Sequence, residues 1–137
     1  KLRIKTPRAT IQKRILQEQA QGLYKSVASE EILFSSENKI DGGRGSSGWP
    51  SFTKPAERMD GERSCVQETN TFIFDRPLTK LSCSKDGVHL GEVFWGGPPK
   101  WRGGTGRNYC VNSSSLKFVP KEHLTSQERK FYFGDAK

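Results

Sequence analysis

The hydrophobic pattern changes its period near residue 22. Over residues 7–21 the apolar residues recur at helical spacing. The pair Thr6-Pro7 is typical of a helix start, and Gly22 is typical of a helix end. We therefore expect one N-terminal helix, whose thin apolar stripe docks on the rest of the chain.

After Gly22 the apolar segments become short and indicate strands rather than helices. The expected strands are 23–24, 32–34, 71–74, 78–83, 88–94, 109–112 and 116–119. Lys85-Asp86-Gly87 is a turn signal, so it predicts a hairpin between two of these strands. Residues 124–133 are expected to form a short helix or to wrap over the surface.

Polar and glycine-rich segments separate the strands. Residues 41–48 form a Gly/Ser-rich loop that ends on Trp49-Pro50-Ser51-Phe52, whose two large rings need a surface to pack against. Residues 53–70 are polar and are expected to be irregular. Residues 96–106 are rich in Gly and Pro and indicate a further loop.

Composition narrows the fold class. The 137 residues suit one domain with a small core, because hydrophobic residues make up 32% and mean hydropathy is −0.75. With 14 Gly and 7 Pro, a mainly β architecture is favoured over a helical bundle. No apolar run is long enough to cross a bilayer, so we expect no membrane association.

The chain carries a net charge of +8, but its basic residues are spread along the sequence. A solvated basic surface is therefore favoured over nucleic-acid binding. Three cysteines are an odd number, which argues against a secreted disulfide framework and for a reducing compartment. Because the chain begins with Lys1 rather than Met, we expect a trimmed product, in the cytoplasm or, with a mild preference, in an organelle.

Cys110 is the most informative residue. It lies on an expected strand, and in an extended chain Cys110, Asn112 and Ser114 share one face. An amide and a hydroxyl beside a thiol are able to orient a substrate. From this segment alone, a half-buried structural cysteine is the favoured interpretation and a nucleophile is the alternative.

Four sequence blocks together resemble the methionine-R-sulfoxide reductase B family. They are Gly48-Trp49-Pro50-Ser51-Phe52, His89-Leu90-Gly91, Tyr109-Cys110-Val111-Asn112-Ser113 and Ser115-Leu116-Lys117-Phe118. The resemblance covers residues 24–121. It implies one reductase-like domain over 1–137, with an N-terminal helical segment, 1–22, and a tail, 122–137. It also implies a mainly β fold of two antiparallel sheets facing each other.

The resemblance implies a role for each matching residue. Cys110 would attack the sulfoxide sulfur as a thiolate. Trp49 would form the apolar wall for the substrate methyl group, and Phe52 of the same block is grouped with it as substrate-binding. His89 would orient or protonate the sulfoxide oxygen. Asn112 matches the family's asparagine two residues after the nucleophile.

Two departures affect the expected site. Position 92 is Glu92, where the family usually has a second histidine, and a glutamic acid can still donate a proton. A β-bulge at Gly91 would let His89 and Glu92 reach one pocket. Asn108 stands where arginine is common, so Arg107 is expected to compensate as a substrate-binding residue.

The family's structural zinc site is also changed. Its four cysteine positions correspond to Ser26, Ser29, Cys83 and Asp86. One thiolate out of four does not make a tetrahedral zinc site, so we expect a member without metal, held by packing and hydrogen bonds instead.

The usual resolving cysteine is replaced by Ser47. Cys65, expected in a flexible polar loop, is the preferred resolver. Cys83 and direct reduction by an external thiol stay open. The implied partners are oxidised methionine in proteins or peptides, as the substrate, and thioredoxin or another dithiol, as the reductant. The protein itself is expected to be a monomer. The competing hypothesis is a non-catalytic binding module on the same fold, using the basic surface with Trp95 and Trp101.

Overall fold

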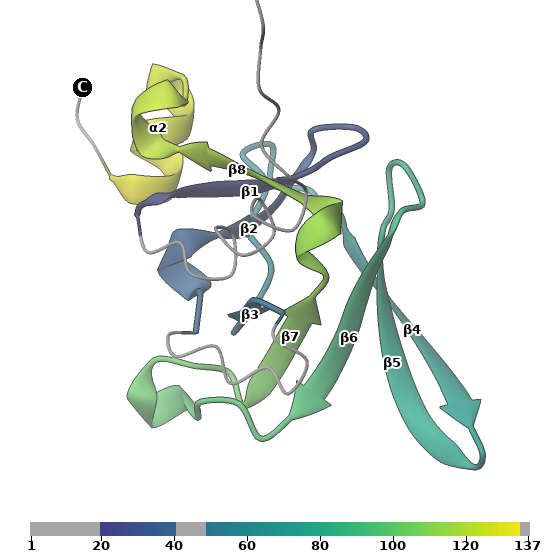
Figure 1. Cartoon of the computed structure of the whole chain (residues 1–137). Helices are drawn as coiled ribbons and strands as arrows, with labels where there is room; N and C mark the ends of the chain where they lie inside the picture. Colours follow the sequence, from purple (N-terminus) through teal and green to yellow (C-terminus); the bar gives the residue numbers. More distant parts are fainter. Residues whose placement is uncertain (1–19, 41–48, 135–137) are drawn as a thin grey trace, which may run out of the picture.

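The computed structural model describes residues 20–40 and 49–134, which form two antiparallel sheets facing each other and a C-terminal helix (Figure 1). The first sheet has the order β2-β1-β8, with β1 at Gly22–Ser26, β2 at Ile32–Ser35 and β8 at Leu116–Pro120. The second has the order β3-β7-β6-β5-β4. Its strands are β3 at Ser51–Phe52, β4 at Val66–Ile73, β5 at Arg76–Cys83, β6 at His89–Trp95 and β7 at Arg107–Val111.

This architecture confirms the predicted mainly β fold of two facing sheets. The described part of the chain has four 3₁₀ turns, three between strands and the last between β8 and the C-terminal helix: η1 Ser36–Asn38, η2 Lys100–Arg102, η3 Ser113–Ser115 and η4 Lys121–His123. The glycine-rich loop 41–48 lies outside the described residues. So does the helix predicted over 7–21, except for its last two residues, 20 and 21.

Helix α2, Ser126–Phe133, begins with a capping box. The hydroxyl of Thr125 accepts a hydrogen bond from the Glu128 N–H, and the Glu128 carboxylate accepts one from the Thr125 N–H. Gly134 ends the helix in the left-handed conformation. The prediction of a short helix within 124–133 is confirmed. None of the helices among the described residues has the length and apolar content needed to span a membrane.

An aromatic cluster joins the two sheets. Phe52 of β3 is stacked on Phe34 of β2 with ring centroids 4.5 Å apart, and its ring also meets Tyr24 of β1 edge-on at 5.1 Å. All three rings are fully buried. Aromatic contacts of this kind add to the stabilisation that comes from burying the rings. The core therefore lies between the sheets, with Phe52 at its centre.

Strands β4 and β5 form a long hairpin that projects from the body of the molecule (Figure 1). Pairing runs from Val66 opposite Cys83 to Ile73 opposite Arg76. Phe74 and Asp75 make the turn with φ of 51° and 64°. The expectation that residues 53–70 are irregular is therefore wrong from Val66 onward. Because β4 is an exposed edge strand with mostly polar side chains, it carries no hydrophobic alternation.

The four residues matched to the family's zinc positions converge on the carboxylate of Asp86. The Ser26 hydroxyl donates to Asp86 over 2.6 Å, and the Val88 N–H donates to the other oxygen of Asp86 over 2.9 Å. Hydrogen bonds from Ser26, Ser29 and the backbone of Val88, with a smaller one from Cys83, hold the pKa of Asp86 well below its usual range. This cluster ties β1 and its turn to the β5–β6 turn.

Two hydroxyls, one thiol and one carboxylate do not fit zinc, which needs thiolates or imidazoles in a structural site. Within the part of the chain that the structure describes, no group of three or more His, Cys, Asp or Glu side chains is placed to hold a metal ion. We therefore assign the connecting role at this position to the hydrogen bonds of Asp86.

We predict that Ser26→Ala lowers the free energy of unfolding by about 1–2 kcal/mol at pH 7, because a partly buried carboxylate loses a hydrogen-bond donor. The folded-state pKa of Asp86 is depressed, so its contribution is complete above the unfolded value near about 4 and is lost below it. Urea unfolding should thus show the difference shrinking at acidic pH. Ser84→Ala, an exposed serine of the same turn, should change little; equal losses in both variants would contradict the assignment.

Candidate functional site

Cys110 lies on an inner strand, β7, whose two faces have different surroundings. Tyr109 and Val111 belong to the buried core cluster between the sheets. Since side chains alternate along a strand, Cys110 points to the opposite face. Its side chain is only 4% exposed, and the thiol is not in a disulfide. The nucleophile candidate is thus held on rigid backbone, apart from the core.

Strand register gives Cys110 its neighbours. Ser51 of β3 lies directly opposite Cys110 on one side, and Glu92 of β6 lies directly opposite on the other. Directly paired side chains share a face of the sheet, with Cβ atoms about 4.5–5.5 Å apart. The sequence pattern identified Glu92 as a candidate but missed Ser51. The sequence did hold a signal for Ser51. It is the neighbour of Phe52, whose large ring needs a core, so in a strand Ser51 points to the opposite face.

A β-bulge brings His89 to the same face as Glu92. Leu81 pairs with Gly91 while the next residue, Ser82, pairs with His89, so Leu90 is the extra residue in β6. Leu90 and Val93 both enter the core cluster although they are three positions apart. His89 and Glu92 therefore both take the outer face. The structure places this bulge at Leu90, beside the predicted position, Gly91.

Gly91 allows β6 to approach β7 closely at the site. A Cβ atom on Gly91 would lie 2.0 Å from the carbonyl oxygen of Cys110, a distance that no side chain tolerates. The absence of a side chain at Gly91 therefore helps to set the position of the Cys110 backbone.

Asn112 closes the end of β7. Its N–H donates to the Leu90 carbonyl over 2.7 Å, and its side-chain oxygen accepts hydrogen bonds from the N–H and hydroxyl of Ser114. The amide nitrogen is the part of the Asn112 side chain that this cap does not use. The expectation that Ser114 shares the strand face of Cys110 is wrong, because a 3₁₀ turn begins at Ser113.

The ends of the neighbouring strands are also fixed by hydrogen bonds. The Ser115 hydroxyl donates to the His89 carbonyl over 3.0 Å, and the Val111 N–H donates to the Pro50 carbonyl over 3.0 Å. Trp49 is half-buried. Trp49 precedes β3 and is joined to Ser51 through Pro50.

The structure does not bring the other two expected substrate-binding residues to Cys110. Phe52 is fully buried in the core between the sheets. Arg107 lies on the core-side face of β7, where its guanidinium holds both oxygens of Glu68 at 3.0 and 2.6 Å and donates to the Tyr109 hydroxyl. This bidentate pair lowers the pKa of Glu68. Arg107 also lies over the Trp95 ring.

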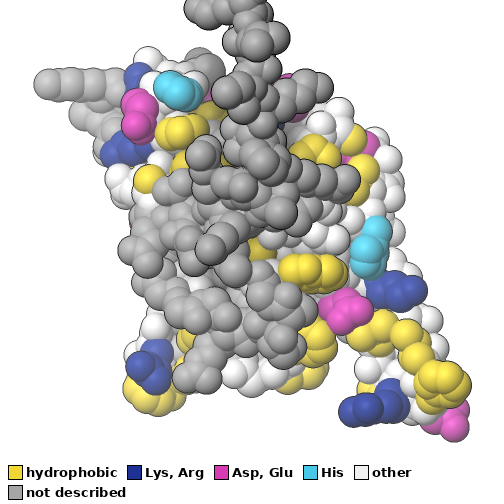
Figure 2. Space-filling view, viewed as in Figure 1, with side chains coloured by type: hydrophobic (Ala, Val, Ile, Leu, Met, Phe, Trp, Pro, Cys, Tyr) yellow, Lys and Arg dark blue, Asp and Glu magenta, His cyan; other side chains and the backbone are white. Residues whose placement is uncertain are grey.

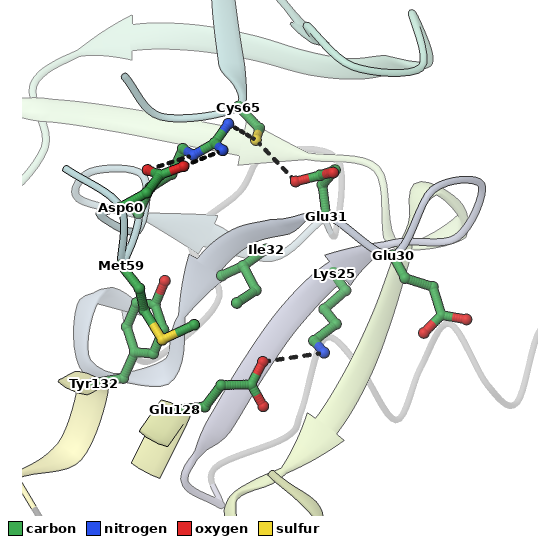
Figure 3. A pocket seen from close by; sticks show the side chains of 10 residues that line it. Lys25, Glu30, Glu31, Ile32, Met59, Asp60, Cys65, Glu128 and Tyr132 are labelled. Carbon is green, nitrogen blue, oxygen red and sulfur yellow. Dashed lines mark hydrogen bonds and ion pairs between the residues drawn. The ribbon is translucent and has the colours of Figure 1, made fainter. Parts of the chain in front are cut away.

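Cys65 lies in a different place from the one predicted. It is 1% exposed and belongs to the core cluster, so its expected position in a flexible, polar loop is wrong. The Cys65 thiol lines a pocket of about 270 Å³ together with Glu31 (Figure 3), and the Arg58 guanidinium lies 3.5 Å from the sulfur. The thiol donates to Glu31 over 3.3 Å, and burial followed by this carboxylate raises the pKa of Cys65.

Cys65 and Cys110 are separated by the width of the sheet. Cys65 immediately precedes β4, which is three strands away from β7 in the order β7-β6-β5-β4. Three inter-strand spacings amount to roughly 14 Å, whereas a disulfide needs Cα atoms about 4.4–6.8 Å apart. Cys83 is buried on β5, two strands from β7. The resolving role of Cys65 stays a prediction that this geometry does not favour.

The projecting hairpin and the end of β6 carry exposed aromatic side chains. Figure 2 shows hydrophobic, basic and acidic side chains together along the projecting hairpin. Phe72 and Phe74 of that hairpin are 70% and 94% exposed, and Trp95 is 79% exposed. These residues lie at the far end of the hairpin and of β6 from His89, outside the group formed by Cys110, Glu92 and His89.

Comparison with known protein families gives a match over most of the chain. Residues 2–120 match the SelR domain. The chain belongs to the SelR domain family. The predicted family is thereby confirmed.

Several SelR relatives are named peptide methionine sulfoxide reductase MsrB. The one from Hahella chejuensis is 42% identical over 107 residues, covering 78% of this chain and 68% of the relative. The one from Pasteurella multocida is 36% identical over 109 residues, covering 80% and 75%. A mouse relative, named methionine-R-sulfoxide reductase B3, mitochondrial, is 39% identical over 101 residues, covering 74% of this chain and 35% of the relative.

Proposed function

We propose that this SelR domain reduces methionine-R-sulfoxide in proteins or peptides, with Cys110 as the nucleophile. The observation that carries the proposal is the register of β6 and β7. A buried thiol on a rigid inner strand has a carboxyl group directly across from it, and a bulge adds an imidazole to the same face. A nucleophile beside a proton donor is the arrangement that sulfoxide reduction requires.

The first step transfers oxygen from substrate to enzyme. The Cys110 thiolate attacks the sulfoxide sulfur, and the sulfoxide oxygen takes up a proton as the sulfur–oxygen bond weakens. The sulfur–sulfur bond made by the attack breaks as the oxygen passes to Cys110. Methionine leaves in its reduced form, and Cys110 becomes a sulfenic acid, oxidised by two electrons. Glu92 is the residue that we assign as proton donor, because it is the direct cross-strand partner of Cys110.

The other residues on this face position the substrate. His89 reaches the face through the bulge and orients the sulfoxide oxygen or relays its proton. Asn112 uses its side-chain oxygen in the cap, which leaves its amide nitrogen to donate toward the substrate. Trp49 supplies the apolar wall for the methyl group. Phe52 and Arg107, which lie on the core side, act on the site only by holding β3 and β7.

Regeneration needs a second thiol. The separation between β4 and β7 favours attack on the Cys110 sulfenic acid by an external dithiol, such as thioredoxin, over attack by Cys65. The external thiol forms a mixed disulfide with Cys110 and releases water. Its second thiol then displaces Cys110 as a thiol and leaves the reductant as a disulfide. The raised pKa of Cys65 also reduces its thiolate fraction, which disfavours it as the attacking group.

We predict that Cys110→Ser lowers the turnover of methionine-R-sulfoxide peptides by about 10³-fold or more, because a hydroxyl cannot replace the thiolate. Chromatography of both sulfoxide epimers measures the effect, and wild-type protein should consume only the R epimer. A variant that folds and retains near wild-type turnover would reject the proposal and favour a binding module on this fold.

We predict that Cys65→Ser retains thioredoxin-dependent turnover within about twofold, since direct reduction does not use Cys65. Mass spectrometry after one equivalent of oxidised peptide should find the sulfenic acid at Cys110 in both proteins. Dithiothreitol serves as the control reductant. If Cys65→Ser loses turnover with thioredoxin but keeps it with dithiothreitol, or if wild type accumulates a Cys65–Cys110 disulfide, Cys65 is the resolving residue after all.

We predict that Glu92→Ala lowers kcat by about 10²-fold, the usual contribution of a positioned proton donor. Glu92→His places the common family residue at this position and should recover most of the loss, with a pH profile that follows imidazole. Lys80→Ala, which removes the exposed partner of Glu92 on β5, is the matched control and should change kcat little. Equal kcat values for Glu92→Ala and wild type would exclude Glu92 as the donor.

A further inference from the structure

The hydroxyl of Ser51 is buried without a hydrogen-bond partner. The side chain is 1% exposed, and its Oγ atom has no partner among the residues that the structure describes. Burying an unpaired hydroxyl costs stability, and nearly all buried polar groups in native proteins are paired. Such a hydroxyl can donate a hydrogen bond to a neighbouring group that becomes charged during the reaction.

The backbone of Ser51 is fixed, so only its side chain is able to turn. The Ser51 carbonyl accepts the Ile40 N–H over 2.8 Å, and the next residue, Phe52, is anchored in the aromatic core. The register places Ser51 directly opposite Cys110. At the Cβ separation of directly paired residues, rotation about one bond of Ser51 brings its hydroxyl within reach of the Cys110 sulfur.

The charges around Cys110 make such a donor useful. On the same face, β6 presents Glu92 directly opposite the thiol and His89 beyond the bulge, and β5 presents Lys80 opposite Glu92. The nearest of these groups is the carboxyl group of Glu92, and its ionised form, present whenever it has given up its proton, opposes formation of a thiolate beside it. A neutral donor on the other side of Cys110 offsets this effect without displacing Glu92.

We propose that Ser51 is a positioning residue whose hydroxyl donates a hydrogen bond to the Cys110 thiolate and holds the sulfur in its nucleophilic form. This assignment rests on the proposed function of Cys110. Serine suits the position because its side chain is small enough for this buried face, and because its hydroxyl can rotate toward the sulfur when the charge forms.

The test follows the reactivity of Cys110 without substrate. Alkylation of the full chain by iodoacetamide is measured from pH 5 to pH 10, and mass spectrometry quantifies the label on Cys110. Ser51→Ala should move the midpoint of this profile upward by about one pH unit and lower the rate at pH 7 about tenfold, as expected for a lost hydrogen bond to a charged group. Ser51→Thr keeps a hydroxyl and should stay within about 0.3 unit of wild type.

Stability separates this role from a structural one. At pH 5, well below the ordinary thiol pKa of about 8.5, Ser51→Ala should melt at the same temperature as wild type or higher, because it removes an unpaired buried hydroxyl. Ser35→Ala is the matched control, since the Ser35 hydroxyl is also buried but accepts the Glu37 N–H. It should lower the melting temperature and leave the Cys110 profile unmoved.

A midpoint in Ser51→Ala equal to that of wild type overturns the proposal, and so does a Ser51→Thr profile that shifts as far as that of Ser51→Ala. Because the alkylation profile needs no sulfoxide, it fails or succeeds independently of turnover. An unchanged alkylation midpoint in Ser51→Ala, in a protein with normal reductase activity, rejects only the role of Ser51. Full turnover by Cys110→Ser rejects the proposed function.

Discussion

The packing of Phe52 between the sheets is the interaction on which the candidate site depends. Strand β3 has only two residues, so its place is set by one ring stacked on Phe34 and by its pairing with β7. Alternation then turns Ser51 to the opposite face. Tyr109 has the same effect in β7, where its burial turns Cys110 outward. The core thus fixes the direction of side chains that it does not contain.

The bulge in β6 completes this division of the sheet into a packing face and a chemical face. Without the extra residue Leu90, His89 and Glu92 would lie on opposite faces. Gly91 beside it lets the two strands approach at the Cys110 carbonyl. Sheet interiors usually avoid both features, and their occurrence next to the thiol matches the general finding that bulges gather near active sites.

Local patterns in the sequence predicted most strands, the Lys85-Asp86-Gly87 turn and the short C-terminal helix, because each has its own apolar period, turn residues or cap. The family resemblance identified Cys110, His89, Asn112 and Trp49 as candidate site residues. The positions of Phe52 and Arg107 depend on strand register, which a linear pattern does not contain; one residue of slip exchanges the two faces. Cys65 has polar neighbours in sequence, yet the paired strands and Glu31 bury it.

The carboxylate cluster around Asp86 has a consequence for the conditions that the fold withstands. A brace of four thiolates on zinc loses its metal when an oxidant attacks the sulfurs, and it forms only where metal is supplied. In this chain Ser26 and Ser29 lie at two positions where the family resemblance implies zinc thiolates, and of the four side chains in the cluster only the Cys83 thiol reacts with such oxidants. Protonation of Asp86 in acid weakens the cluster, whereas the hydroxyls and the carboxylate do not react with peroxide. The connection between β1 and the β5–β6 turn therefore depends on the charge of Asp86 and requires no supply of metal.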